Sequence, residues 1–213
     1  MFRNFFFVLL GLAFIGDLYF IIVGNQENRL FTKSLLMPLL FFGYFLESKK
    51  QNFKINKIFG LGLVLSFSGD FFLLYNWGFL VGLGSFLLAH VCYILVFWNL
   101  KISNFGNKFV LPILIYLVAF IWYLYPHLGE MKIPVILYAI TISTMLYAAL
   151  NTHRKLLIFG ALFFVISDSI LAYNLFIEKS LATNLLVMIT YVVAQVLLVA
   201  GMINYGIKNK KIA

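Results

Sequence analysis

Apolar residues run almost without interruption along this chain, in stretches of about 20 residues separated by short polar breaks. The stretches are continuous and lack the alternation of polar and apolar residues that membrane β-barrel strands require. An apolar run of this length crosses the hydrocarbon core of a bilayer as an α-helix. The pattern therefore predicts an all-α, polytopic membrane protein, with a single transmembrane domain over residues 1–213 built as a bundle of eight transmembrane helices. The expected helices cover residues 4–24, 32–47, 55–75, 77–98, 108–125, 132–150, 155–176 and 182–206.

Composition and charge agree with a membrane location. The chain is 63% hydrophobic and 11% charged, whereas a soluble domain carries about 25% charged residues. The net charge of +9 does not indicate nucleic acid, because the Lys and Arg residues form short clusters between apolar runs, as in cytoplasmic loops. Most of them lie on the side of the N-terminus when eight crossings are assumed. We therefore expect both termini in the cytoplasm, and a bacterial inner (cytoplasmic) membrane as the location.

The acidic residues divide between loops and membrane segments. All four glutamates lie in or beside loops, while Asp17, Asp70 and Asp168 lie within apolar segments, roughly 8–12 Å below the outer surface. A carboxylate near the bilayer centre costs roughly 2.5–3.5 kcal/mol, so intramembrane carboxylates are functional candidates. The alternative is a set of helix-to-helix hydrogen bonds that only fix packing. Both interpretations stand for Asp17, and we expect Asp70 and Asp168 to form a functional pair.

Polar neighbours of the paired aspartates extend the candidate site. Ser66 precedes Asp70 by one helical turn, and Ser167 is adjacent to Asp168. Such hydroxyls either orient a carboxylate or bond back to helix carbonyls, and the sequence leaves both open. His90 is the only histidine in the expected helices, and Tyr93 three residues later shares its face. A histidine satisfied within the core is the alternative for His90.

A short internal repeat links the two aspartates. Residues 70–76 read DFFLLYN and residues 168–174 read DSILAYN, so both fit D-x-x-L-x-Y-N and end on Asn76 and Asn174. This repeat predicts two parallel four-helix halves, an arrangement found in membrane transporters. Chance similarity within a low-complexity apolar sequence is the alternative.

Motifs for metals, nucleotides and serine hydrolysis are missing from the sequence. It contains no H-E-x-x-H, no P-loop and no G-x-S-x-G, so we expect no metal and no cofactor. Two carboxyl groups that share a low-dielectric cavity tend to hold one proton between them, with one group neutral and one ionised. Such a pair can act as general acid and general base on one bond.

The stretches SGDFFLL (68–74), FLVGLGSFLLAHVCY (79–93) and GALFFVISDSILAYN (160–174) together resemble the YhhN-like, or lysoplasmalogenase, family of membrane proteins. TKSLLMPLL (32–40) is similar to its second-helix signature, although Ser34 stands where the family usually has Pro. The resemblance covers about residues 30–205. It implies an eight-helix enzyme that hydrolyses the vinyl ether of lysoplasmalogens to a fatty aldehyde and a glycerophospho-ethanolamine or -choline.

The resemblance assigns the catalytic positions to Asp70, His90 and Asp168. We expect Asp168 to be the acid, Asp70 the base, and His90 to orient a carboxylate or relay a proton. Lys33 either extends to the membrane surface, meets one of the aspartates or binds the lipid phosphate, and its place near the outer headgroup level suits the phosphate. The further residues expected to bind substrate are Tyr93, Asn76, Asn174, Ser66, Ser167 and Asp17.

The expected partners are a lysophospholipid substrate and membrane lipids, with no nucleic acid and no oligomeric state specified. Two other functions remain open at this stage. A small proton-coupled transporter would also use intramembrane Asp and His residues. The second is a non-catalytic lipid-binding protein, a function that would not explain why carboxylates are buried in the membrane.

Overall fold

The computed structural model describes residues 2–210, with the side chains of residues 2–5 and 76 outside that description. This part of the chain forms eight α-helices, four short 3₁₀ segments and no β-strand. The predicted all-α class is therefore confirmed. The α-helices are α1 (Phe2–Ile22), α2 (Gln26–Gln51), α3 (Lys57–Phe72), α4 (Phe79–Asn99), α5 (Val110–Leu124), α6 (Lys132–Leu150), α7 (Lys155–Phe176) and α8 (Leu181–Lys210).

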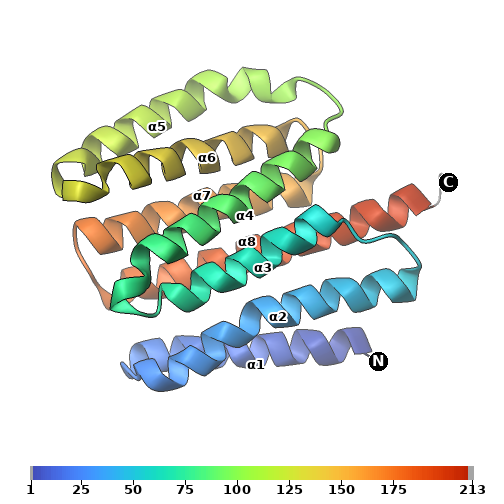
Figure 1. Cartoon of the computed structure of the whole chain (residues 1–213). Coiled ribbons are helices and arrows are strands. Elements are labelled where there is room, and N and C mark those ends of the chain that lie inside the picture. Colours follow the sequence, from blue (N-terminus) through green and yellow to red (C-terminus); the bar gives the residue numbers. More distant parts are fainter. Residues whose placement is uncertain (1, 211–213) are drawn as a thin grey trace.

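The helices run back and forth along one axis, so that connections alternate between two ends of the bundle (Figure 1). The first turn of α1 and the last turn of α8 lie at the same end, which we call the terminal end. The turns after α1, α3, α5 and α7 lie at the opposite end, the turn end. Helices α3 and α7 therefore run in the same direction, from the terminal end to the turn end.

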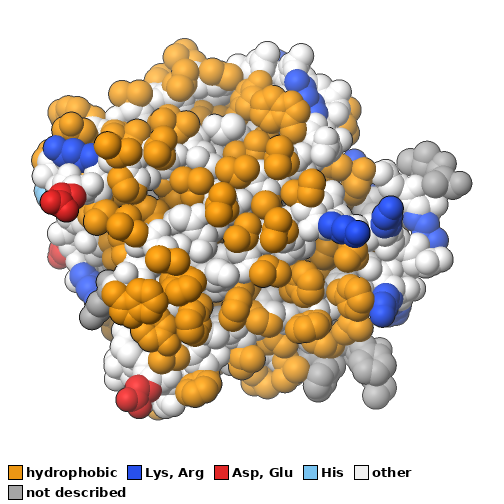
Figure 2. Space-filling view, in the orientation of Figure 1, with side chains coloured by type: hydrophobic (Ala, Val, Ile, Leu, Met, Phe, Trp, Pro, Cys, Tyr) orange, Lys and Arg blue, Asp and Glu red, His pale blue; other side chains and the backbone are white. Residues whose placement is uncertain are grey.

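Six helical segments in the described part of the chain are long and apolar enough to cross a membrane. Four of them are α2, α4, α7 and α8. The other two are α5 and α6, each taken together with its adjoining 3₁₀ turns. The apolar part of α1, Phe6–Ile22, and the 16-residue α3 are shorter. Hydrophobic side chains cover the middle of the face seen in Figure 2, and Asp and Glu appear on it only near the turn end. The protein is an integral membrane protein.

Two helix boundaries differ from those predicted, and both matter for the site. Helix α2 begins at Gln26, several residues before the expected start, because the Asn25 side chain caps it by accepting a hydrogen bond from the Asn28 N–H at 3.0 Å. Helix α3 ends at Phe72 instead of residue 75. Asp70 thus lies in the last turn of α3, whereas α7 continues for two turns beyond Asp168. The two D-x-x-L-x-Y-N motifs adopt different backbone conformations.

Close glycine contacts join the helices that carry the two aspartates to their neighbours. A Cβ atom at Gly69 of α3 would lie 2.5 Å from the Phe86 ring of α4. A Cβ atom at Gly160 of α7 would lie 2.7 Å from the Leu198 side chain of α8. Small residues allow helices in a bilayer to approach closely, because tight van der Waals packing drives their association. The α3–α4 and α7–α8 hairpins are therefore tightly packed supports for Asp70 and Asp168.

Candidate active site

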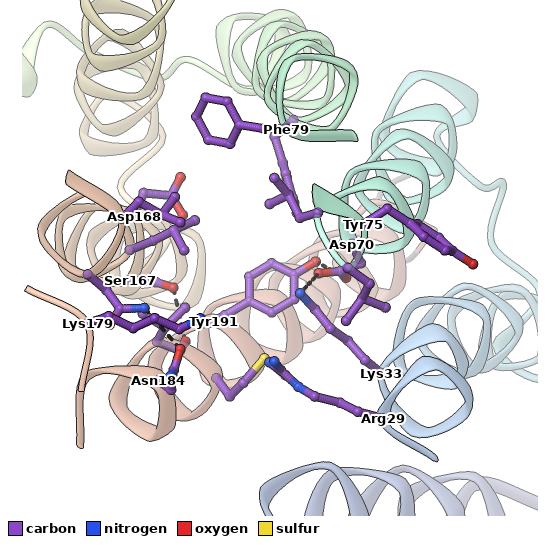
Figure 3. Close-up of a pocket in the computed structure, with 18 of the residues that line it drawn as sticks. Arg29, Lys33, Asp70, Tyr75, Phe79, Ser167, Asp168, Lys179, Asn184 and Tyr191 are labelled. Carbon is purple, nitrogen blue, oxygen red and sulfur yellow. Dashed lines mark hydrogen bonds and ion pairs between the residues drawn. The ribbon is translucent and has the colours of Figure 1, made fainter. Parts of the chain in front are cut away.

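A cavity of about 380 Å³ lies near the turn end, between α2, α3, α4, α7 and α8. Its wall includes Lys33 of α2, Asp70 of α3, Asp168 of α7 and Tyr191 of α8. Figure 3 shows Asp70 and Asp168 on different walls of this cavity, with the Tyr191 hydroxyl directed toward Asp70. Residues separated by about a hundred positions in the sequence thus share one cavity, as the sequence led us to expect.

Asp70 is 2% exposed and has two charged or polar partners. The Lys33 ammonium lies 3.4 Å from one carboxylate oxygen, and the Tyr191 hydroxyl donates to the other at 2.6 Å. A buried carboxylate is stabilised as an anion when a cation and a hydrogen-bond donor satisfy its oxygens. This environment therefore favours an ionised Asp70.

A chain of buried hydrogen bonds leads away from Tyr191. Gln195 Nε2 donates to the Tyr191 hydroxyl oxygen at 3.5 Å, and Tyr93 donates to Gln195 Oε1 at 3.3 Å. Because the one proton of Tyr93 is used in this way, Ser66, 3.2 Å away, must donate to Tyr93. Every donor in the sequence Ser66, Tyr93, Gln195, Tyr191 thus points toward Asp70. We call these four residues the donor chain.

The donor chain corrects two of the predicted substrate contacts. Ser66 and Tyr93 are fully buried and do not line the cavity. Ser66 faces Tyr93 of α4 instead of Asp70, although the two residues are one turn apart on α3. Both residues therefore lie away from the cavity wall, in the hydrogen-bonded chain that ends at Asp70.

Asp168 has a different environment. Tyr138 of α6 donates to its Oδ2 at 2.5 Å, and no cation among the described side chains pairs with it. Asp168 also borders a second, narrow pocket of about 40 Å³ between α4, α6 and α7. This narrow pocket is almost entirely apolar, with Leu83, Val135 and Ala172 on its wall. Without a cation, and beside apolar surface, Asp168 is the carboxyl group better suited to hold a proton.

His90 does not contact either carboxylate, which corrects the direct role that we predicted for it. Its side chain is fully buried, and neither ring nitrogen has a hydrogen-bond partner in the described part of the protein. The ring packs edge-on against Phe164 and Tyr138, with centroid distances of 4.6 and 5.3 Å. Tyr138 therefore lies next to His90 and makes the hydrogen bond to Asp168 itself.

Asp17 is also away from the cavity. It is fully buried and pairs with Arg29 Nε at 3.4 Å, while the Thr32 hydroxyl donates to it at 3.3 Å. The pair joins α1 to α2, so the packing interpretation of Asp17 is the one that the geometry favours. Arg29 itself lines the cavity, and its guanidinium has further N–H donors besides Nε.

The remaining predicted residues fall into two groups. Ser167 and Asn174 line the cavity. The Ser167 hydroxyl donates to the Val187 carbonyl of α8 at 3.1 Å, so it neither orients Asp168 nor bonds back to its own helix but joins α7 to α8. Asn174 donates to Asn184 at 2.9 Å. The side chain of Asn76 lies outside the described residues.

Sequence reasoning missed several wall residues. The polar residues around Arg29 predict a loop, whereas the structure places Arg29 in α2; Asn25, a residue type that often caps helices, is the signal for this earlier helix start. Lys179, in the turn after α7, and Asn184, in the first turn of α8, also line the cavity (Figure 3). Tyr138 lies in an evenly apolar helix, where nothing in the sequence separates it from other tyrosines. No group of three His, Cys, Asp or Glu residues suited to a metal ion occurs among the described side chains.

Comparisons with known proteins agree on one family. A family model described as the YhhN family matches residues 28–202. A protein named lysoplasmalogenase from Mycobacterium tuberculosis is 32% identical over 151 residues, which are 65% of this chain and 58% of that protein. Lysoplasmalogenase TMEM86B of Rattus norvegicus is 27% identical over 185 residues, 85% of this chain and 78% of that protein. The chain thus spans less than two thirds of the mycobacterial relative. No solved structure matches.

Proposed function

Because the chain belongs to the YhhN family, we propose that it is a membrane-embedded lysoplasmalogenase that cleaves the vinyl ether bond of a single-chain phospholipid. The observation that supports this function best is the pair of unlike carboxyl groups on one cavity. Asp70 is paired with a cation and Asp168 is not. An acid-catalysed addition of water needs one carboxyl group in each state.

The first step is protonation of carbon. A vinyl ether accepts a proton at the alkene carbon beta to the oxygen, which lies on the hydrocarbon side, and becomes an oxocarbenium ion. Asp168 gives this proton because it borders the narrow apolar pocket, where the hydrocarbon chain of the lipid would enter. Tyr138 donates to one oxygen of Asp168, which leaves the other oxygen to carry the acidic proton.

The second step is addition of water at the carbon bonded to oxygen. Asp70, held ionised by Lys33 and Tyr191, stabilises the cation and removes a proton from the attacking water. Carboxylate pairs in glycoside hydrolysis share this division of roles across an oxocarbenium-like transition state. The product of this step is a hemiacetal, with the proton now on Asp70 and with Asp168 ionised.

Collapse of the hemiacetal restores both groups. Asp70 returns its proton to the departing glycerol oxygen, and Asp168 removes the proton of the hemiacetal hydroxyl as the aldehyde forms. One water molecule is consumed, and a fatty aldehyde and a glycerophospho-alcohol are released. The overall reaction is balanced with no other reactant.

The cavity also suits the orientation of the lipid. Arg29, Lys33 and Lys179 lie on the side of the cavity away from the narrow pocket, so the phosphate would lie near them (Figure 3). Lys33 is already paired with Asp70, whereas Arg29 pairs with Asp17 through Nε alone and keeps further N–H donors, so Arg29 and Lys179 are the better phosphate ligands. Asn174 and Asn184 offer amide groups to the glycerol and the headgroup.

The same proposal includes the topology in the membrane. All eight helices would cross the bilayer, with the terminal end in the cytoplasm of a bacterium and the cavity near the outer surface. The common end of the termini and the excess of Lys and Arg there support this orientation. The parallel directions of α3 and α7 support the proposal of two equivalent four-helix halves.

The test is release of fatty aldehyde by the purified, detergent-solubilised protein from a lysoplasmalogen. A saturated alkyl ether lysolipid of the same length is the matched control, because it lacks the carbon that accepts the proton. We expect aldehyde from the first lipid and none from the second. Absence of aldehyde from both, together with proton-coupled flux in liposomes, would replace the hydrolase with a transporter.

A further inference from the structure

A second charged cavity lies at the terminal end, far from the carboxylates. It has a volume of about 290 Å³ and lies between the turn after α6, the start of α7 and the end of α8. Its wall includes three cations, Arg154, Lys155 and Lys208, together with Ile102 and Asn204. No carboxylate among the described residues lines it. The cavity therefore concentrates positive charge in a concave surface.

The cations of this basic cavity are free of acidic partners. Within residues 2–210 neither Arg154, Lys155 nor Lys208 forms an ion pair. The Arg154 guanidinium lies 4.4 Å from the centroid of the Tyr205 ring, which holds it in place. Its Nε atom is buried and has no hydrogen-bond partner in the described structure.

Backbone geometry adds to this charge. Arg154 is the N-cap residue of the 22-residue α7, and no side chain caps the first turn of that helix. The N–H groups at a helix N-terminus and the helix dipole both favour an anion. Lys155, the first residue of α7, lines the same cavity. Side-chain and backbone donors thus converge on one place.

The surroundings indicate a lipid and not a soluble anion. Ile102, which lines the cavity, is 66% exposed, and Trp98 and Phe159 nearby on α4 and α7 are 51% and 50% exposed. An exposed apolar side chain therefore lies in the cavity wall, and the adjoining helices α4 and α7 carry further exposed apolar side chains within four residues of wall residues. Basic pockets between transmembrane helices on the cytoplasmic side bind anionic headgroups. We propose that this basic cavity binds the phosphate of an anionic phospholipid from the adjacent leaflet.

The test compares lipid binding by two variants of the full-length protein in detergent. The site variant carries Arg154→Gln, Lys155→Gln and Lys208→Gln. The control variant carries Lys49→Gln, Lys54→Gln and Lys57→Gln, three changes at the same end that leave the cavity wall intact. We expect the apparent affinity for phosphatidylglycerol, measured by thermal stabilisation, to be about 100-fold weaker in the site variant. The control variant should bind within threefold of the unmodified protein, by a rough estimate.

Three outcomes would overturn the proposal. Equal weakening in both variants would indicate general charge attraction. Equal stabilisation by phosphatidylcholine would show that an anionic headgroup is not required. Equal stabilisation by inorganic phosphate would indicate a soluble anion and not a lipid. Aldehyde release is measured separately, so failure here leaves the proposed hydrolase untouched.

Discussion

Asp70 and Asp168 begin the same seven-residue pattern on two parallel helices, yet their surroundings differ. Asp70 meets Lys33 and the end of the donor chain. Asp168 meets one tyrosine hydroxyl and an apolar pocket. The difference comes from the neighbours on other helices and not from the motif itself. Similar sequence positions can therefore carry opposite roles in a proton-transfer reaction, depending on which helix packs against them.

Loss of the carboxyl group of Asp70 or of Asp168 should have the largest effect on kcat. Asp70→Asn and Asp168→Asn each keep the side-chain shape but remove the base or the acid, so we expect kcat to fall by about 1,000-fold in both. Glu47→Gln is the matched control, because Glu47 is a buried carboxylate near the terminal end. The measurement is aldehyde release by variants of equal thermal stability. Near-normal activity in either aspartate variant would refute the mechanism.

Removal of the Lys33 cation should have the next largest effect on kcat. Lys33→Met leaves Asp70 buried without its partner, which costs about 3–5 kcal/mol of stability. We expect kcat to fall by about 10- to 100-fold, since an unpaired buried Asp70 takes up a proton and stops acting as a base. Lys33→Arg should retain more activity than Lys33→Met.

A double variant separates stability from catalysis. Lys33→Met combined with Asp70→Asn should recover most of the lost thermal stability, because no buried charge remains, but none of the activity. Recovery of activity in the double variant would show that the ion pair serves folding alone.

The two tyrosines allow a closer comparison of the carboxyl groups. Tyr191→Phe and Tyr138→Phe each remove one hydrogen bond, to Asp70 and Asp168 respectively. A hydrogen bond to a charged group contributes about 1.5–3 kcal/mol, so we expect roughly a tenfold or larger loss of kcat from Tyr191→Phe. The loss from Tyr138→Phe should be smaller, because a neutral Asp168 gains less from a donor. A reversed order would exchange the acid and base assignments.

The smallest effects should come from the donor chain. Gln195→Leu removes the donor that orients Tyr191, and we expect about a three- to tenfold loss of kcat with little change in KM. Ser66 lies two hydrogen bonds further from Asp70 than Gln195 does, so Ser66→Ala should change kcat by less than about twofold. A change in KM as large as the change in kcat would indicate that Gln195 contacts substrate, contrary to its complete burial.

The sequence predicted the helical class, the position of both termini at one end of the bundle, and the meeting of Asp70 and Asp168 at one cavity. These follow from apolar run length, charge position and the cost of burying a carboxylate. It did not predict the partners of each carboxylate. Spacing along a helix shows that Ser66 and Asp70 lie one turn apart, but which neighbour each meets depends on helix rotation.

The same limit explains His90 and Tyr138. A histidine in an apolar helix stands out in the sequence, while a tyrosine among twelve does not. In the folded protein the tyrosine makes the contact to Asp168, and the histidine packs behind it. Rarity of a residue type in the sequence was therefore a poor guide to its place in the site.

The narrow pocket beside Asp168 has a consequence for the timing of the reaction. At about 40 Å³ it has room for little of a hydrocarbon chain, so α4, α6 and α7 would have to separate for a long chain to enter it as the proposed mechanism requires. Motions of packed helices are slower than side-chain motions and occur in microseconds to milliseconds. Turnover would then follow the fluidity of the surrounding bilayer, with viscous, tightly ordered lipids slowing the enzyme even when its chemistry is unchanged.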